Sequence, residues 1–330
     1  MVAEMIDKDV LKQYGIFQDN ILSIKPADKV GNTAIKIWFI KQKDTSKIFV
    51  LKMVKLKHKQ FPIELQHLLH HNGFGTPSVY RTEKGELYIS SKKGYYFLSE
   101  YVEPNEKLST KQRTKALADF HRIARFRELK VIKEKIQFPN FQQFNRVYNN
   151  KLIDLKKWHS SVKKDERKAY LGEMINQAET SLGILKTCNV EEYIKAMTAR
   201  NSICHGDYNA RNSYLNSEGE TMVIDFDRAY FGLPIDDFRF LVHSLASRSD
   251  HVQKLDFLFD EYFSHSPEDK KFKPLYLADT IFPHQFHKQM TRNLKGKAIK
   301  NLKKINTEEF MNWIEVERRK KSYVMEKLYL

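Results

Sequence analysis

Two stretches of the sequence decide the fold: residues 205–212 read His-Gly-Asp-Tyr-Asn-Ala-Arg-Asn, and residues 223–227 read Val-Ile-Asp-Phe-Asp. Asp207 stands five residues before Asn212, and Asp225 follows Asn212 by thirteen residues. Between them the residue types predict a hairpin, with extended segments at 213–216 and 221–224 and a turn at 217–220. Such a hairpin brings Asn212 and Asp225 side by side, as a shared metal site requires.

The spacing follows the catalytic pattern H-R-D-x-x-x-x-N and D-F-G of phosphoryl transfer. In that chemistry the first carboxylate accepts the proton of the attacking hydroxyl, and the Asn and the second Asp hold Mg²⁺ against the nucleotide phosphates. The pattern therefore predicts Asp207 as the general base and Asn212 and Asp225 as Mg²⁺ ligands. Asp227 either binds a second Mg²⁺ or orients water, or it makes a structural hydrogen bond.

Two neighbours of Asp207 have open roles. His205 is expected to orient the catalytic loop rather than to act as an acid or base. Arg211 either contacts the transferred phosphate or the acceptor, or it pairs with a nearby carboxylate. By its position Asp237 resembles the buried Asp that, in proteins with this catalytic pattern, satisfies backbone N–H groups of the catalytic loop.

Composition limits the class of protein. The chain has 330 residues, of which 41% are hydrophobic, and this predicts a globular protein with an ample core. No run of about eighteen apolar residues predicts a transmembrane helix, and the first residues lack the apolar core of a secretory signal. The two cysteines, Cys188 and Cys204, make no disulfide framework and favour a reducing compartment.

The formal net charge is +16, with basic residues concentrated near the C-terminus. Most of these side chains are expected to lie on solvated helix faces, and the alternative is a groove that attracts an anionic acceptor or partner. No nucleic-acid-binding motif is present, so nucleic acid is an unlikely partner.

The chain divides into a β-rich N-terminal lobe at 1–102 and a helical C-terminal lobe at 103–330 that carries the catalytic loop, the metal site and the acceptor site. One helix interrupts the strands, with Pro62 in its first turn and Gly73 at its C-cap. The strands are predicted at 21–24, 33–40, 47–54, 78–81, 86–90 and 95–101. The later helices are predicted at 109–127, with Ser109 as N-cap, and at 141–158, 165–187, 190–200, 235–263, 274–294 and 307–328.

The N-terminal lobe supplies the predicted nucleotide site. Lys52 ends an apolar strand and is expected to contact the α- and β-phosphates, with Lys55 and Lys57 as alternatives and Glu64 as its ion-pair partner. Residues 99–102 are the predicted hinge, where the Glu100 carbonyl and the Val102 N–H would bind the adenine edge. Gly31 is the single glycine in the loop predicted to cover the phosphates, where kinases carry several.

Taken together with residues 232–239, these motifs resemble the aminoglycoside-phosphotransferase and choline-kinase group. More narrowly, the chain resembles the spore-coat-associated CotS-type family of endospore-forming bacteria. Further matching segments are Ala118 to His121, Lys157 to His159 and Ile281 to His284. The resemblance spans nearly the whole chain and implies an α+β, two-lobed protein-kinase-like fold that binds ATP. It also implies an acceptor site built by the helices at about 141–200 and by the C-terminal helices.

The sequence therefore predicts a phosphotransferase that uses ATP and Mg²⁺ and acts on a hydroxyl group of a small molecule or a protein. The competing hypothesis is a kinase-fold protein of weak or absent turnover that assembles the spore coat with other coat proteins. A third, a nucleic-acid-binding protein, depends on charge alone. The predicted location is the cytoplasm at synthesis and, by resemblance, the spore coat.

Overall fold

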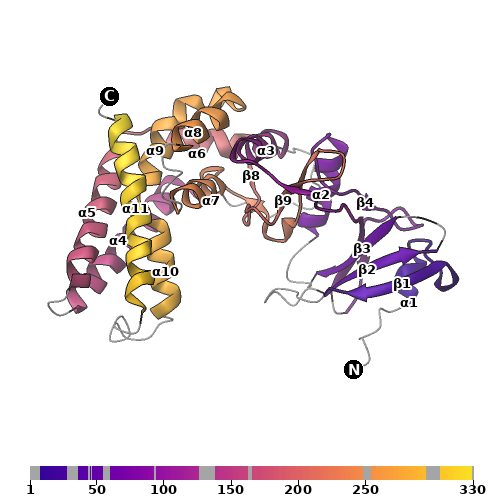
Figure 1. The fold of residues 1–330 in the computed structure, drawn as a ribbon. Helices are drawn as coiled ribbons and strands as arrows, with labels where there is room; N and C mark the ends of the chain where they lie inside the picture. Colours follow the sequence, from indigo (N-terminus) through magenta and orange to yellow (C-terminus); the bar gives the residue numbers. More distant parts are fainter. Residues whose placement is uncertain are drawn as a thin grey trace. The chain divides into compact units, whose positions relative to one another are not determined.

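The computed structural model describes residues 8–27, 36–43, 45, 47–54, 60–92, 94–125, 138–162, 166–247, 254–294 and 305–328. These residues form two compact units (Figure 1). The first unit comprises residues 1–116, 122–136 and 205–230, and the second comprises 117–121, 137–204 and 231–330. The first unit thus adds the segment 205–230, which carries the catalytic motifs, to the N-terminal part of the chain.

An antiparallel six-stranded sheet forms the core of the first unit, in the order β1-β2-β3-β6-β4 with β5 paired to β6. The strands are β1 (Ile21–Pro26), β2 (Lys36–Gln42), β3 (Ile48–Val54), β4 (Val79–Tyr80), β5 (Ile89–Ser90) and β6 (Tyr95–Glu100). Along β3, Phe49, Leu51 and Met53 are buried in one hydrophobic cluster, which also takes residues from α1 (Lys8–Lys12). Because side chains alternate along a strand, Lys52 projects from the opposite face of β3.

The helix predicted within this lobe is α2 (Phe61–His71), with Pro62 in its first turn. It ends in a Schellman motif, in which Phe74 N–H donates to Leu69 O and Gly73 N–H donates to His70 O, both at 3.0 Å. Gly73 takes φ +75°, so the predicted C-cap glycine is confirmed. A short 3₁₀ helix, η1 (Gln18–Asn20), precedes β1.

The predicted hairpin is also present in the first unit. Strands β9 (Ser213–Leu215) and β10 (Thr221–Val223) pair antiparallel with Ser213 opposite Val223, and β7 (Glu106–Lys107) adds to β9. The 3₁₀ helix η3 (Phe226–Arg228) follows β10. The two remaining short strands are β8 (Ile203–Cys204) and β11 (Tyr230–Phe231).

Helices dominate the second unit, and α3 (Thr110–Ile123) contributes residues to both units. The predicted cap at Ser109 is confirmed, since Ser109 Oγ accepts from Gln112 N–H while Gln112 Oε1 accepts from Ser109 N–H. The other helices are α4 (Phe141–Ser161), α5 (Glu166–Leu185), α6 (Val190–Ala199), α7 (Ile235–Ala246), α8 (Lys254–Ser264), η5 (Pro267–Phe272), α9 (Lys273–Ile281), α10 (His284–Leu294) and α11 (Thr307–Leu328).

Two helix predictions were too long. The helix predicted at 274–294 is divided into α9 and α10 at Phe282 and Pro283. Proline lacks the N–H that a helix interior needs and forces the preceding residue out of the helical region, and Phe282 accordingly has ψ +132°. The helix predicted at 235–263 consists of α7 and α8, which are separated by residues outside the described ranges.

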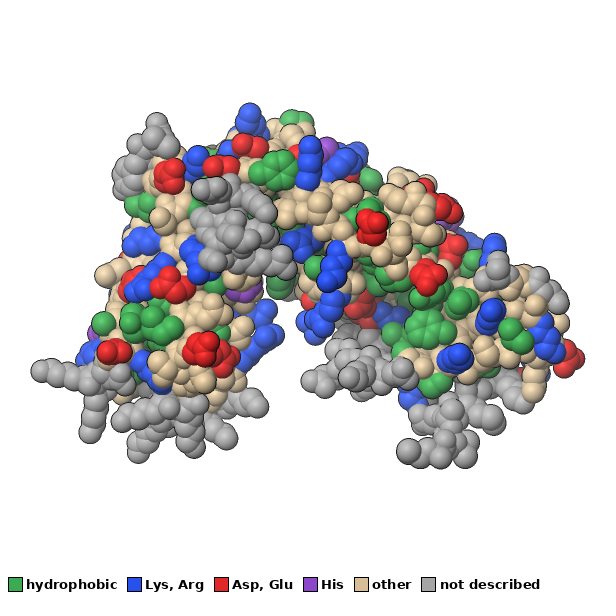
Figure 2. Space-filling model, viewed as in Figure 1, with side chains coloured by type: hydrophobic (Ala, Val, Ile, Leu, Met, Phe, Trp, Pro, Cys, Tyr) green, Lys and Arg blue, Asp and Glu red, His purple; other side chains and the backbone are tan. Residues whose placement is uncertain are grey.

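Surface charge is mixed on the face shown in Figure 2, where Lys and Arg side chains are interspersed with Asp and Glu side chains. Among the described residues, ion pairs at the surface include Lys195 with Glu191, Lys156 with Glu179 and Lys271 with Glu192. Within the described ranges, no helix combines the length and the apolar character that a membrane crossing demands.

Candidate active site

Lys52 is the cation around which two of the predicted site residues gather. Its Nζ donates to Asp225 Oδ1 at 2.8 Å and to Asp227 Oδ1 at 2.7 Å, and its side chain is 12% exposed. Burial opposes the charged form of Lys52, but the negative charges of Asp227 and Asp225 outweigh burial and raise the pKa of Lys52 above its ordinary value. The ammonium is therefore protonated at neutral pH and holds the end of the second motif against β3.

The backbone at Asp225 is strained. Asp225 has φ +68° and ψ +60°, the left-handed conformation that non-glycine residues rarely adopt and that costs roughly 1–3 kcal/mol at a functional site. Just before it, Ile224 N–H donates to Asn212 O at 3.0 Å, which places Asn212 beside the start of this turn. The turn allows Asp225 and Asp227, two residues apart, to reach the same ammonium.

The two aspartates differ in their ionisation. Burial acts to raise the pKa of Asp225, but the Lys52 ammonium outweighs it and holds the pKa below its usual value. Burial also raises the pKa of Asp227, and the neighbouring Asp225 charge raises it further against the pull of Lys52. The side chain of Asp225 is 41% exposed and that of Asp227 is 15% exposed, so the more solvated carboxylate carries the charge more readily.

These residues fit a magnesium ion. Among the described residues Asp227 Oδ2 is buried without a hydrogen-bond partner, so this oxygen is available to bind a metal ion. Asn212 Nδ2 donates to Asp207 O at 2.9 Å, which leaves the Asn212 side-chain oxygen for a metal. In the part of the chain that the structure describes, no group of three or more His, Cys, Asp or Glu side chains is arranged as a metal site, so this candidate consists of two carboxylates and one amide. Two carboxylates and one amide match Mg²⁺, which keeps several waters and phosphate oxygens as ligands.

Asp207 is held in the catalytic loop by local hydrogen bonds. Asn209 Nδ2 donates to Asp207 O at 2.9 Å and to Asp207 Oδ1 at 3.2 Å. Tyr208, which is 1% exposed, anchors the loop through its hydroxyl to Arg113 O at 2.7 Å. The Asp207 carboxylate is partly exposed on a fixed backbone, the arrangement that a general base requires.

His205 joins the two motifs. Its Nδ1 accepts from the Asp207 backbone N–H at 3.3 Å, so Nε2 carries the proton and donates to Ile224 O at 3.1 Å. The ring is completely buried and lies 5.0 Å from the ring of Phe226. Both nitrogens are engaged with backbone, which supports the orienting role expected from the sequence.

Two glycines that the sequence reasoning did not single out shape this site. Gly206 has φ +75°, and a Cβ there would lie 2.3 Å from Arg228 O. At Gly75, after α2, a Cβ would lie 1.9 Å from Thr221 O, and Val223 N–H donates to Gly75 O at 2.8 Å. The position of Gly206 between His205 and Asp207 in the motif was the sequence signal that could have indicated its role. No local sequence pattern indicates the role of Gly75.

Two predicted residues that the structure describes, Glu64 and Arg211, form no ion pair within the cluster around Lys52, and others lie outside the described ranges. Gly31 lies outside the described residues, as do the alternatives Lys55 and Lys57. Across the described residues, no ion pair joins Lys52 to Glu64, whose pKa is raised by burial. In this structure the Lys52 ammonium donates to Asp225 and Asp227, and the pairing with Glu64 stays a prediction. Arg211 is exposed, and in the described part of the chain its side chain forms no ion pair.

At the predicted hinge, Glu100 N–H donates to Ser78 O and Tyr101 N–H donates to Ile48 O, both at 3.0 Å. Val102 O accepts from the Tyr214 hydroxyl at 2.9 Å. No acceptor for the Val102 N–H occurs within the described ranges, which is consistent with a donor that faces a ligand.

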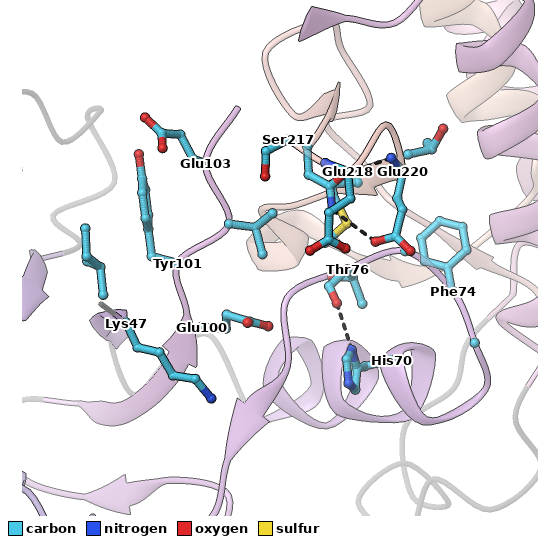
Figure 3. A pocket seen from close by; sticks show the side chains of 17 residues that line it. Lys47, His70, Phe74, Thr76, Glu100, Tyr101, Glu103, Ser217, Glu218 and Glu220 are labelled. Atoms are coloured by element: carbon cyan, nitrogen blue, oxygen red, sulfur yellow. Dashed lines mark hydrogen bonds between the residues drawn. The ribbon is translucent and has the colours of Figure 1, made fainter. Parts of the chain in front are cut away.

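A cavity of about 710 Å³ lies next to the hinge (Figure 3). Its lining includes Glu100, Glu103, Glu218 and Glu220 but none of the residues around Lys52. The Glu100 carboxylate belongs to this cavity and accepts from Ser78 Oγ at 3.3 Å. The cavity thus adjoins the predicted hinge residues Glu100 and Val102.

In the second unit, Asp237 is completely buried, as expected. Its Oδ2 lies 3.1 Å from His121 Nε2, and His121 Nδ1 lies 2.7 Å from the Tyr262 hydroxyl. The segment 118–121 thus supplies a buried partner for Asp237. Its role toward the catalytic loop stays a prediction.

Solved structures of phosphotransferases resemble this chain over nearly their whole length. An aminoglycoside phosphotransferase from Alicyclobacillus acidocaldarius has 15% sequence identity and a TM-score of 0.73, covering 99% of this chain and 96% of its own. A spectinomycin phosphotransferase in complex with ADP and spectinomycin has 16% identity and a TM-score of 0.57, with coverages of 95% and 97%. The GDP complex of an aminoglycoside 2′-phosphotransferase has 12% identity, a TM-score of 0.54 and 95% coverage of both chains.

At these identities the likeness shows the fold, and it confirms the predicted α+β kinase-like architecture of an N-terminal antiparallel sheet followed by a mostly helical part. The model of the phosphotransferase enzyme family matches residues 40–268, which is 229 of the 330 residues. That span includes Lys52 and both catalytic motifs. The chain belongs to the phosphotransferase enzyme family.

Proposed function

We propose that this protein transfers the terminal phosphoryl group of ATP to a hydroxyl group, with Mg²⁺ as cofactor. The observation that carries the proposal is the cluster of Lys52, Asp225 and Asp227, with its orphaned carboxylate oxygen, beside the Asp207–Asn212 loop. Phosphoryl transfer needs little covalent chemistry from the protein, and these residues supply the positioning and the charge that it does need.

Each residue has a distinct task in this scheme. Asp207 accepts the proton of the acceptor hydroxyl as its oxygen bonds to the γ-phosphorus and the bond from phosphorus to the ADP oxygen breaks. The positively charged ammonium of Lys52 contacts the negatively charged nucleotide phosphates. Asn212, Asp225 and Asp227 would hold Mg²⁺, which neutralises phosphate charge when bound. His205 fixes the distance between the two motifs from its buried position.

ATP is the proposed nucleotide because the spectinomycin phosphotransferase with the same fold carries ADP. The aminoglycoside 2′-phosphotransferase carries GDP, so the nucleobase that this protein prefers must be tested directly. The Glu100 carbonyl and the Val102 N–H remain the proposed contacts to the base. A comparison of ATP with GTP by calorimetry decides between the two nucleotides.

The proposed acceptor is the hydroxyl group of a small molecule, by analogy with the spectinomycin bound to its phosphotransferase. A protein hydroxyl is the alternative that the same carboxylate at Asp207 would serve. Incubation with labelled ATP and two acceptor panels, hydroxylated small molecules and spore-coat extracts, tests both. Label on a small molecule supports the proposal, and label confined to protein supports the alternative.

The association with the spore coat is also a proposal, and it rests on the sequence resemblance. Under the competing hypothesis, the protein assembles the coat and turns over little or no ATP. Replacement of the chromosomal copy by Asp207→Asn separates the two hypotheses. If coat assembly fails in that variant, the coat role requires catalysis, and if assembly is normal, the protein acts as a scaffold.

The test of the nucleotide site itself is a calorimetric titration of ATP with and without Mg²⁺, on wild type and on Asp225→Asn. The proposal expects binding that depends on Mg²⁺ and that is weakened in the variant. Equal binding by both proteins, or no binding in any condition, would overturn the assignment of the site.

A further inference from the structure

The second unit contains a buried polar network whose centre is an ion pair between α7 and α9. Arg239 Nε donates to Asp279 Oδ2 and Arg239 Nη2 donates to Asp279 Oδ1, both at 2.7 Å. Asp279 Oδ1 also accepts from the Tyr148 hydroxyl of α4 and lies 2.9 Å from His284 Nε2 at the start of α10. Asp279 is 1% exposed, and burial acts to raise its pKa, but Arg239 and His284 outweigh burial and hold the pKa well below the usual range.

The protons of this network can be assigned from its contacts. His284 Nε2 donates to Asp279 Oδ1, so His284 Nδ1 has no proton and accepts from Lys151 Nζ at 2.8 Å. Burial, with help from the positive charges of Arg239 and Lys151, lowers the pKa of His284 well below its usual value. His284 is therefore neutral, and the ammonium of Lys151 has a neutral partner.

Lys151 has no carboxylate of its own in the described part of the chain. Asp279 and Asp236 both form ion pairs with Arg239. Asp154, one turn along α4 from Lys151, lies 3.0 Å from His287 Nε2. Lys151 is partly buried and uses one of its three N–H donors on His284, so the other two have no acceptor from the described residues.

The surroundings of Lys151 add positive charge. Burial is the largest cause that lowers the pKa of Lys151, and the positive charge of Arg239 on α7 is the next. Together with the charge of Lys288 on α10, they lower this pKa to about 8, against the opposite effect of Asp279 and Asp236. A partly buried ammonium without a counter-ion is costly, and an anion placed beside it would recover that cost. The site therefore favours a negatively charged ligand.

We propose that Lys151, at the junction of α4 and α10, binds an oxyanion, the carboxylate or phosphate group of a small molecule. Lysine suits this role because its ammonium is a compact point charge with several donors. The neighbouring network, from His284 through Asp279 to Arg239, fixes the position of the Lys151 side chain. It cannot itself neutralise the charge of the Lys151 ammonium. The proposal concerns a binding site in the second unit and does not depend on turnover at Asp207.

The first test is an NMR titration of the lysine ε-methylene groups in the full-length protein, with the Lys151 signal assigned from Lys151→Arg. Inorganic phosphate and acetate are the probes, and sodium chloride at equal ionic strength is the control. If the site binds an oxyanion, phosphate or acetate raises the pKa of Lys151 by about one unit or more, which corresponds to about tenfold tighter binding to the charged form. A Lys151 signal that responds to neither probe beyond the chloride control would overturn the proposal.

The two probes also separate the two sources of oxyanion. A response to phosphate alone assigns a phosphate group, and an equal response to acetate assigns a carboxylate. Lys156, on the same helix α4, pairs with Glu179 at 2.6 Å and is the internal control, because its signal should not respond to either anion. An equal response at Lys156 would mean unspecific screening and would also overturn the proposal.

A second test compares Lys151→Met with Lys156→Met by calorimetry with the anion that gave the larger response. Loss of a charge-assisted hydrogen bond weakens binding by roughly tenfold to 100-fold, so Lys151→Met should bind at least about tenfold more weakly than Lys156→Met. Lys151→Arg keeps the charge and should bind within a few-fold of wild type. Equal affinity in both methionine variants would contradict the assignment to Lys151, and the NMR titration of wild type decides if Lys151→Met does not fold.

Discussion

The His205 ring accepts a hydrogen bond from the backbone N–H of Asp207 at 3.3 Å, and its other nitrogen donates to Ile224, the residue before the strained Asp225. One buried imidazole thus spans the proposed base and the proposed metal ligand. Since the ring is neutral and both its nitrogens contact backbone groups, His205 holds the two motifs in position and does not transfer protons.

Replacement of His205 by Leu removes both of these hydrogen bonds. Each orphaned backbone group costs about 1–3 kcal/mol when it is buried, so we expect a lower free energy of unfolding and a lower kcat. The shape of the pH–rate profile should not change, because both ring nitrogens of His205 are bound to backbone groups. Urea denaturation measures the first effect, and kinetics as a function of pH measure the second. If one ionisation disappears from the pH–rate profile of the variant, His205 acts as an acid or a base in the reaction.

The Asp207→Asn variant separates binding from chemistry. Asparagine preserves the shape of the side chain and the contact with Asn209 but cannot accept a proton. General-base catalysis is worth roughly 100- to 10,000-fold, so kcat should fall by that factor while the Kd for ATP with Mg²⁺ changes little. Retained turnover would contradict the assignment of the base, and a large rise in Kd would indicate a role in binding.

Asp225→Asn and Asp227→Asn test the two carboxylates around Lys52. Even residues that only support a metal ligand are worth roughly 10- to 100-fold in affinity, so Asp225→Asn should weaken Mg²⁺-dependent ATP binding by at least about tenfold. Asp227→Asn should weaken it too, because Asp227 Oδ2 has no hydrogen-bond partner among the described residues. Glu83→Gln, on the exposed turn between β4 and β5 and outside the lining of the hinge cavity, is the matched control for loss of one negative charge.

If Asp227→Asn lowers the free energy of unfolding but leaves Mg²⁺ binding unchanged, Asp227 is a structural residue. Calorimetry with ATP, in the presence and absence of Mg²⁺, distinguishes these outcomes for each variant.

Gly206→Ala and Gly219→Ala form a matched pair. Both glycines have positive φ, +75° and +78°, but a Cβ at Gly206 lies 2.3 Å from Arg228 O, whereas a Cβ at Gly219 meets nothing within 4 Å. Left-handed backbone alone costs about 1–2 kcal/mol, so we expect that loss in Gly219→Ala and unchanged kcat. Gly206→Ala should lose more stability and most activity. Equal effects on kcat and on urea denaturation would show that the close approach to Arg228 is unimportant.

The dependence of stability on pH should include a contribution from His243. Burial and the charges of Lys320 and Lys288 lower the pKa of His243 from 6.5 to about 4. The unfolded chain therefore binds a proton that the folded chain does not. Below pH 6.5 the free energy of unfolding should fall by up to about 1.4 kcal/mol per pH unit from this group, until pH reaches about 4.

His243→Leu should flatten the stability profile between these two pH values, since leucine cannot take up the proton and has no orphaned nitrogen like His243 Nδ1. Urea denaturation of wild type and variant at several pH values measures the difference. Parallel profiles would contradict the assignment.

Local chemistry made much of this protein predictable from its sequence. The residue types between Asn212 and Asp225 predicted the hairpin of β9 and β10, because turn residues and extended segments determine a hairpin within a few residues. The helix ends at Ser109 and Gly73 were predictable for the same reason, since caps depend on neighbours three to five residues away.

Contacts between distant residues were decided only by the tertiary structure. Lys52 pairs with Asp225 and Asp227, 173 and 175 residues away, and not with Glu64 in the nearer helix. The left-handed Asp225 and the network from Arg239 to Lys151 likewise have no local signal. The sequence by itself determined the family pattern, the hairpin and the caps, whereas packing decided which carboxylate meets which cation. The physical reason is that an ion pair inside a protein depends on burial and on the partners brought together by the whole chain, which no local pattern specifies.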